Sequence, residues 1–99
     1  METKMRKAAK WDASEHLATE EEMAAYLNAA LEDGDTSVIA TALGDIARAK
    51  GMTQLSKETD ITRDGLYKEL SLTGNPSFDT VQKAIRAFGL KLDAETAAV

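Results

Sequence analysis

The chain has 99 residues, of which 43% are hydrophobic, 29% are charged and none is cysteine. This length suits one small globular domain with a modest core, to which a second subunit would add stability. The lack of cysteine excludes disulfides, thiolate nucleophiles and cysteine-ligated metal sites. No apolar run approaches the ~20 residues of a membrane span. The basic N-terminus lacks the apolar stretch of a signal peptide, so we expect a cytoplasmic protein.

The net charge of −5 hides a division of the chain into an acidic and a basic half. Residues 11–47 hold nine acidic residues and no Lys or Arg, whereas residues 48–91 hold eight basic and five acidic residues. Such segregation indicates two surfaces that meet two kinds of partner. A solvated helix face would explain the acidic half equally simply, and the sequence leaves that choice open.

Local patterns predict helices through the first half of the chain. Residues 11–18 form a lead-in that includes a short helical turn. Thr19 and Glu22 fit a capping box at the start of a helix that Gly34 ends. The next helix carries an apolar stripe with helical spacing and ends at Gly51.

Three shorter helices are expected in the second half of the chain, over residues 53–59, 62–70 and 78–88. Residues 90–92 alternate apolar and polar side chains, a weak indication of a short strand. Together these elements predict a single helical domain over residues 19–92. It follows an N-terminal lead-in of residues 1–18 and precedes a tail of residues 93–99.

Residues 53–70 have the spacing of a helix-turn-helix. That motif needs a small residue where its helices cross, then a residue that tolerates left-handed backbone geometry at the turn, then an apolar residue. Ser56, Asp60 and Ile61 stand at these positions, and Leu66 supplies the core aliphatic residue of the second helix. An ordinary short helical hairpin would show a similar pattern.

Residues 51–70 and 74–81 resemble the lambda-repressor-like, Xre-type helix-turn-helix. Residues 11–17, 26–35 and 42–51 narrow this to a resemblance to the probable addiction-module antidote proteins, the HigA-like antitoxins of toxin–antitoxin pairs. The resemblance implies an all-α bundle of about five helices, in which one extra N-terminal helix precedes the helix-turn-helix. It also implies sequence-specific DNA binding, repression of the protein's own operon and neutralisation of a toxin.

In a helix-turn-helix, the second helix enters the major groove of double-stranded DNA with its first residues against base edges. Arg63 can donate two hydrogen bonds to a guanine. Asp64 can accept a hydrogen bond from a cytosine or hold the Arg63 side chain in place. Gly65 permits close approach of the backbone either to the DNA or to the neighbouring helix. The expected DNA-binding residues are Thr53, Gln54, Thr62, Arg63, Asp64, Gly65, Tyr67, Lys68 and Ser77.

The resemblance also implies a partner for the acidic half of the chain, a small basic toxin of the RelE/ParE type. An acidic surface would neutralise such a toxin and block its access to a polyanionic target. The expected toxin-binding residues are acidic, with two apolar residues expected to be exposed: Trp11, Leu17, Glu20, Glu21, Glu22, Glu32 and Asp35.

Because one helix-turn-helix reads only a few base pairs, we expect a homodimer on a palindromic operator. Residues 90–92 or the last helix would supply the dimer contact. Nothing in the sequence indicates an enzyme, a cofactor or a metal site, since His16 is the single histidine and no second one stands at metal-ligand spacing. Two other functions stay open: a stand-alone repressor without a toxin, and a protein-interaction module without DNA binding.

Overall fold

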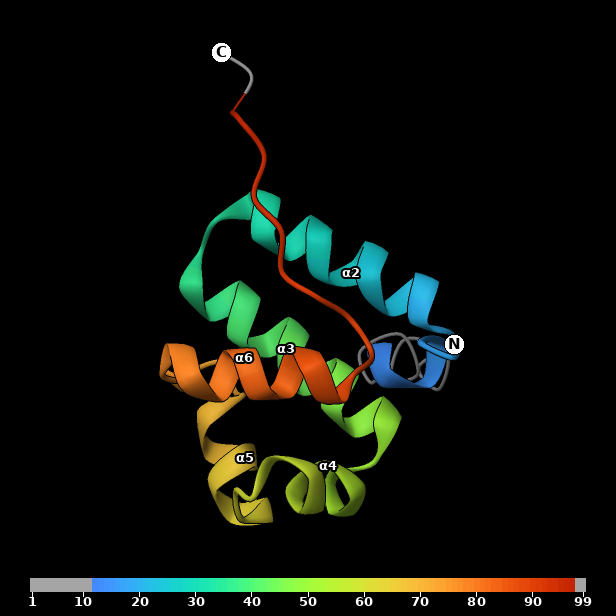
Figure 1. Ribbon diagram of the computed structural model, residues 1–99, viewed down its shortest axis with the longest axis vertical. Helices are drawn as coiled ribbons and strands as arrows, with labels where there is room; N and C mark the ends of the chain where they lie inside the picture. Colours follow the sequence, from blue (N-terminus) through green and yellow to red (C-terminus); the bar gives the residue numbers. More distant parts are fainter. Residues whose placement is uncertain (1–11, 98–99) are drawn as a thin grey trace, which may run out of the picture.

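The computed structural model describes residues 12–97, and every regular element in this range is a helix (Figure 1). The lead-in contributes one short 3-10 helix, and five α-helices follow it. Their bounds are η1 Ala13–His16, α2 Glu20–Asp33, α3 Thr36–Lys50, α4 Met52–Thr59, α5 Arg63–Glu69 and α6 Phe78–Ala87. The expected all-helical class with about five helices is therefore confirmed. The short strand suggested at residues 90–92 is wrong, because this segment is extended but has no strand partner within the described range.

The predicted helix ends coincide with the observed caps. The hydroxyl of Thr19 accepts from the Glu22 amide at 3.1 Å, and the Glu22 carboxylate accepts from the Thr19 amide at 3.1 Å. Gly34 then ends α2 with a φ of 83°, a left-handed conformation that glycine adopts without steric cost. Asp35 caps α3 by accepting from the amide of Ser37 at 2.9 Å.

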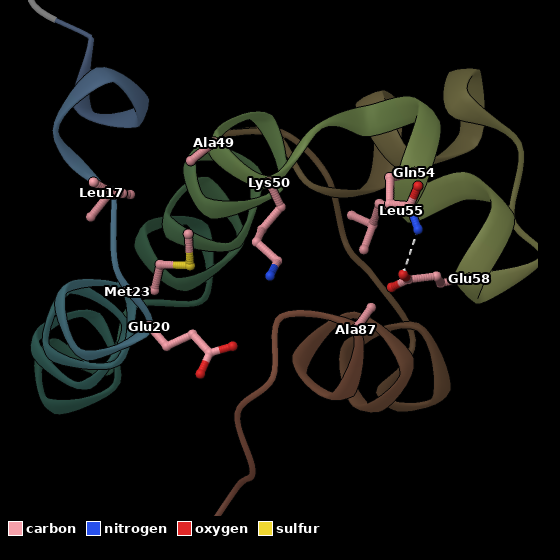
Figure 2. Close-up of a pocket in the computed structure, with 10 residues that line it drawn as sticks. Leu17, Glu20, Met23, Ala49, Lys50, Gln54, Leu55, Glu58 and Ala87 are labelled. Atoms are coloured by element: carbon pink, nitrogen blue, oxygen red, sulfur yellow. Dashed lines mark hydrogen bonds between the residues drawn. The ribbon is translucent and has the colours of Figure 1, made fainter.

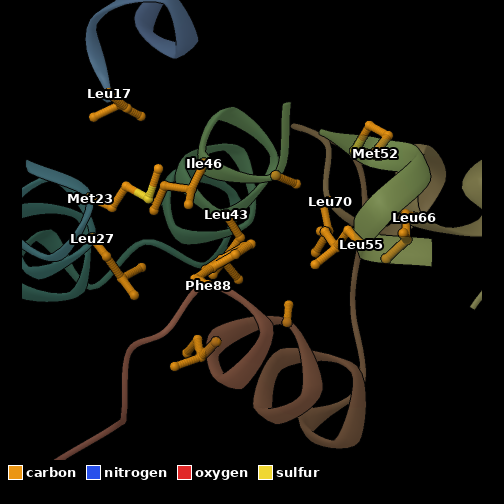
Figure 3. Close-up of a cluster of buried hydrophobic side chains, with 13 residues drawn as sticks. Leu17, Met23, Leu27, Leu43, Ile46, Met52, Leu55, Leu66, Leu70 and Phe88 are labelled. Atoms are coloured by element: carbon orange, nitrogen blue, oxygen red, sulfur yellow. The ribbon is translucent and has the colours of Figure 1, made fainter. Parts of the chain in front are cut away.

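Helix α3 is the centre of the fold, because η1 and the other four α-helices all pack against it (Figure 1). Its side chains Leu43, Ile46 and Ala47 are fully buried. Around them lies an aliphatic core with one aromatic ring, Phe88, at its middle (Figure 3). The remaining members of the core come from the other four α-helices and from the residues directly after η1 and α5: Leu17, Met23, Leu27, Met52, Leu55, Leu66, Leu70, Ala84 and Ile85.

Gly44 permits the close approach of α3 to the end of α5. A Cβ atom added at Gly44 would overlap the backbone carbonyl of Leu70, which no side-chain rearrangement can relieve. The α4–α5 pair is thus seated directly on α3. This contact limits how far the end of α5 can lie from α3.

A polar network ties η1, α2 and α3 together beside the core. The Tyr26 hydroxyl donates to Asp45 at 2.5 Å, and the Arg48 guanidinium donates to Asp45 at 2.8 Å and to Asp12 at 3.0 Å. Asp45 is the one charged residue that is buried in residues 12–97. Hydrogen bonds from Arg48 and then from Ser14 lower the pKa of Asp12. Arg48, counted in the basic half of the sequence, is therefore neutralised inside the acidic half.

Candidate functional site

The turn between α4 and α5 has the geometry that its sequence predicts. Asp60 ends α4 with φ 63° and ψ 26°, the left-handed conformation expected at this position. The Ser56 hydroxyl donates to the carbonyl of Ile61 at 2.5 Å. The Thr59 hydroxyl donates to the carbonyl of Leu55 at 2.8 Å and accepts from the Ile61 amide at 3.3 Å. Side-chain hydroxyls thus hold the turn, and the hydroxyl of Ser56 has a function that a smaller alanine would lack.

Helix α5 has one buried and one exposed face. Leu66 is fully buried in the core, and Leu70 is buried directly after the helix. Arg63, Asp64 and Lys68 are exposed, and the ring of Tyr67 is 46% exposed. Since α5 is only two turns long, the core contact of Leu66 orients the whole exposed face. The structure thus brings four of the predicted DNA-binding side chains onto one accessible helix.

The polar side chains on this exposed face have few internal partners. The guanidinium of Arg63 makes no ion pair or hydrogen bond within the described part of the chain. Asp64 lies 3.9 Å from Lys68, one turn along the helix, and both side chains are largely exposed. An exposed pair at this distance contributes little to stability. The suggestion that Asp64 holds Arg63 in place is not what is seen, because Asp64 faces Lys68.

The remaining predicted DNA-binding residues lie at helix starts. Thr62 caps α5 by accepting from the Gly65 amide at 3.0 Å, and Ser77 caps α6 by accepting from the Thr80 amide at 3.1 Å. Thr53 is exposed in the first turn of α4, which begins without a side-chain cap. The other four α-helices each have a capping side chain. The first amides of α4 therefore receive no hydrogen bond from a capping side chain.

Gln54 is oriented differently from its neighbours. Its side-chain amide donates to Glu58 at 2.7 Å, and both residues line a cavity of about 590 Å³ (Figure 2). The ammonium group of Lys50 and the carboxylate of Glu20 also point into this cavity (Figure 2). Because acidic and basic groups face one another here, the cavity is polar and of mixed charge.

The predicted toxin-binding acids do not form one patch. Glu20, Glu21 and Glu22 lie in the first turn of α2, whereas Glu32 lies at its end and Asp35 begins α3. A 14-residue helix is about 20 Å long, so the two groups are well separated.

Three of these five acids also have structural partners. Amide donors at residues 18 and 19 lower the pKa of Glu22, the hydroxyl and amide of Ser37 lower the pKa of Asp35, and Glu20 lies against Gly89. Glu21 and Glu32 are exposed on α2.

The expected exposure of Leu17 is wrong. Its side chain is only 8% exposed and packs into the core, where it joins η1 to α2 and α3. The sequence shows an isolated leucine between polar residues, and no local pattern tells whether the rest of the fold covers it. Trp11, the other apolar candidate, lies outside the described residues.

The described chain is thus a small all-helical protein whose charged side chains concentrate on exposed helix faces. Among residues 12–97 no cluster of His, Cys, Asp or Glu is arranged to hold a metal ion. In the same range, none of the helices has the length and apolar character needed to cross a membrane.

Residues 7–96 match the family described as probable addiction module antidote protein, and the chain belongs to this family. A Haemophilus influenzae protein, described only as uncharacterized, is 47% identical over 85 residues, which make up 86% of this chain and 88% of that protein. No solved structure matches the chain.

Proposed function

We propose that this antidote-family protein is a DNA-binding antitoxin. It represses its own operon through a lambda-repressor-like helix-turn-helix over residues 53–70, and neutralises a small basic toxin of the RelE/ParE type. It acts in the cytoplasm as a single helical domain over residues 19–92. The observation that carries the DNA-binding half is the exposed face of α5, which is held outward by the buried Leu66 and by the left-handed turn at Asp60.

Recognition of the operator uses the free polar groups of this face. Arg63 donates two hydrogen bonds to the acceptor atoms of a guanine in the major groove. Tyr67, one helical turn further along α5, reaches a base edge or a phosphate. Lys68 and the uncapped first turn of α4, including the exposed Thr53, contact phosphates, because uncapped backbone amides at a helix start favour anions. These contacts fix the register of α5 in the groove.

The surroundings of Gly65 support close approach of the α5 backbone to DNA. A Cβ atom added there would meet only the Thr62 hydroxyl at 3.1 Å and the Ile61 side chain at 3.4 Å. No atom of another helix lies within contact distance, so packing between helices does not require this glycine. We therefore favour the DNA over the neighbouring helix as the reason for a glycine in the first turns of α5.

A homodimer completes the site, because two copies of α5 on half-sites one helical turn apart read enough base pairs for useful affinity. The segment after α6 provides a contact surface, since Leu90 and Leu92 are only partly buried against the core and Lys91 is exposed. A chain shortened to end at Gly89 is expected to be monomeric in sedimentation experiments. If the shortened chain still dimerises, the dimer contact lies in another part of the protein.

The test is binding of the purified protein to the DNA segment immediately upstream of its own gene, measured by fluorescence anisotropy. Arg63→Ala is expected to lose about 1–3 kcal/mol, which is about 5- to 150-fold in Kd. Lys68→Ala is expected to weaken binding to all sequences alike and to reduce the salt dependence by about one phosphate contact. Arg86→Ala, the same change on the exposed last turn of α6, is the matched control and leaves binding unchanged.

The alternatives predict different results. If Arg63→Ala and Lys68→Ala both bind like the unaltered protein, the DNA-binding proposal is wrong and a protein-interaction module becomes the better account. If DNA binding holds but the neighbouring gene encodes no small basic protein, the chain is a stand-alone repressor.

A further inference from the structure

An apolar groove of about 430 Å³ lies between α2 and α3, away from the α5 face. Ala29 and Ala30 of α2 form one wall and Val38 and Ala42 of α3 form the other, while Leu72 borders it from the connection between α5 and α6. Leu72 is 65% exposed and Val38 is 39% exposed. Exposed aliphatic side chains that share a concave surface are typical of an interaction site.

The groove has an acidic edge and an unsatisfied hydroxyl. Asp33 lines the groove, and Glu32 and Asp35 are exposed close to it in the chain. No Lys or Arg occurs between residues 12 and 47, and Arg48 is already paired with two carboxylates. The buried hydroxyl oxygen of Thr41, which also lines the groove, has no hydrogen-bond partner in the described part of the chain.

We propose that this groove is the surface on which the toxin docks, by inserting the apolar face of a basic amphipathic helix. The proposal rests on the antitoxin half of the proposed function. An aliphatic floor with an acidic edge fits a helix that has leucine-like side chains on one face and Lys or Arg beside them. A second copy of this chain fits poorly, because a two-fold contact places this face against itself, and residues 12–47 contain no Lys or Arg to pair with Glu32, Asp33 and Asp35.

The acids at the other end of α2 offer a weaker surface. Glu20 shares its cavity with the cation of Lys50, and Glu22 is held by the capping box. A basic helix placed there would meet a competing positive charge. The acidic residues therefore form two groups, one at each end of α2. Only the group at the C-terminal end of α2 lies beside the apolar groove.

The main test uses the product of the gene beside this one as the probe, purified and titrated by isothermal calorimetry. Ala29→Arg places a long cation in the groove and is expected to weaken binding by at least about tenfold, because like charges then meet. Ala25→Arg is the matched control, since Ala25 is an exposed alanine one turn earlier on α2 and does not line the groove. Both variants are expected to bind operator DNA as the unaltered protein does, which shows that they fold.

A second pair of variants tests the acidic edge. Glu32→Gln is expected to slow association about threefold at low salt, with the difference vanishing at high salt, because steering by exposed charges is screened. Glu21→Gln makes the same change at the other end of α2 and is expected to have no effect. Equal slowing by both variants would show that overall charge, and not this edge, directs the partner.

The outcomes separate the two proposals. If the unaltered protein does not bind the neighbouring gene product, the toxin half of the proposed function fails and the docking surface fails with it. If the unaltered protein and Ala29→Arg bind it equally, only the docking surface is wrong. A photoreactive side chain placed at Leu72 is expected to cross-link to the toxin, and cross-linking to a second copy of this chain instead would identify the groove as a dimer contact.

Discussion

The region from η1 to α3 and the α4–α5 pair differ in where their polar side chains find partners. In the first region, Tyr26, Asp45, Arg48 and Asp12 bind one another in a network that joins three elements. On α5, the guanidinium of Arg63 has no partner within the described chain. Both regions contribute side chains to the same core.

This difference separates polar groups that position the fold from polar groups that are available to a partner. A buried carboxylate such as Asp45 must be paired, because desolvation of an unpaired charge is costly. An exposed arginine on a rigid helix keeps its hydration until a ligand replaces the water. The charge of a region therefore says less about its partners than the number of its charges that are still unpaired.

The largest effect is expected at the contact that joins the two regions. Gly44→Ala would force α3 and the end of α5 apart, and should lower the free energy of unfolding by about 3 kcal/mol. Chemical denaturation would measure the loss. Gly65→Ala is the control, because its added Cβ meets only the side chains of Thr62 and Ile61, at 3.1 and 3.4 Å, and alanine favours a helix by up to about 1 kcal/mol, which offsets the small shift that these contacts require. It should keep the stability and lower the DNA affinity, and a Gly65→Ala protein that unfolds easily would contradict our assignment of this glycine to DNA.

A smaller effect is expected from the polar network alone. Arg48→Met leaves the buried carboxylate of Asp45 without its cation, and should lower stability by about 1–3 kcal/mol. Arg86→Met removes an exposed arginine and should change stability by less than about 0.5 kcal/mol. Neither variant is expected to alter DNA affinity at a temperature where both are folded. Loss of DNA binding by folded Arg48→Met would show that the network also shapes the α5 face.

The smallest effect depends on pH. Burial, and then the hydrogen bond to Asp45, raise the pKa of Tyr26 from 10.0 to about 12. The folded state thus favours the protonated phenol, so its contribution to stability is complete below pH 10 and is lost as the pH rises toward 12. Unfolding midpoints measured across this range should fall, and they should fall less in Tyr26→Phe, which has no proton to lose. A parallel decline in both proteins would assign the alkaline loss to other groups.

Sequence alone predicted the helices and most of their ends. The capping box of Thr19 and Glu22 and the helix ends at Gly34 and Gly51 lie where they were expected, because caps are contacts between residues a few positions apart in the chain. The left-handed conformation of Asp60 was predictable for the same reason. Of the candidate site, the exposed polar residues of α5 could be inferred, since helical spacing places them opposite Leu66.

What the sequence could not determine are the contacts between distant residues. The burial of Leu17 and the pairing of Arg48 with Asp12 and Asp45 both depend on how other elements pack on α3. The groove beside Leu72 exists only because the α5–α6 connection reaches the α2–α3 hairpin. Local hydrogen bonds and helical periodicity depend on residues that are neighbours in the sequence. The burial of a side chain and the pairing of charged groups depend instead on segments that meet only after the chain has folded.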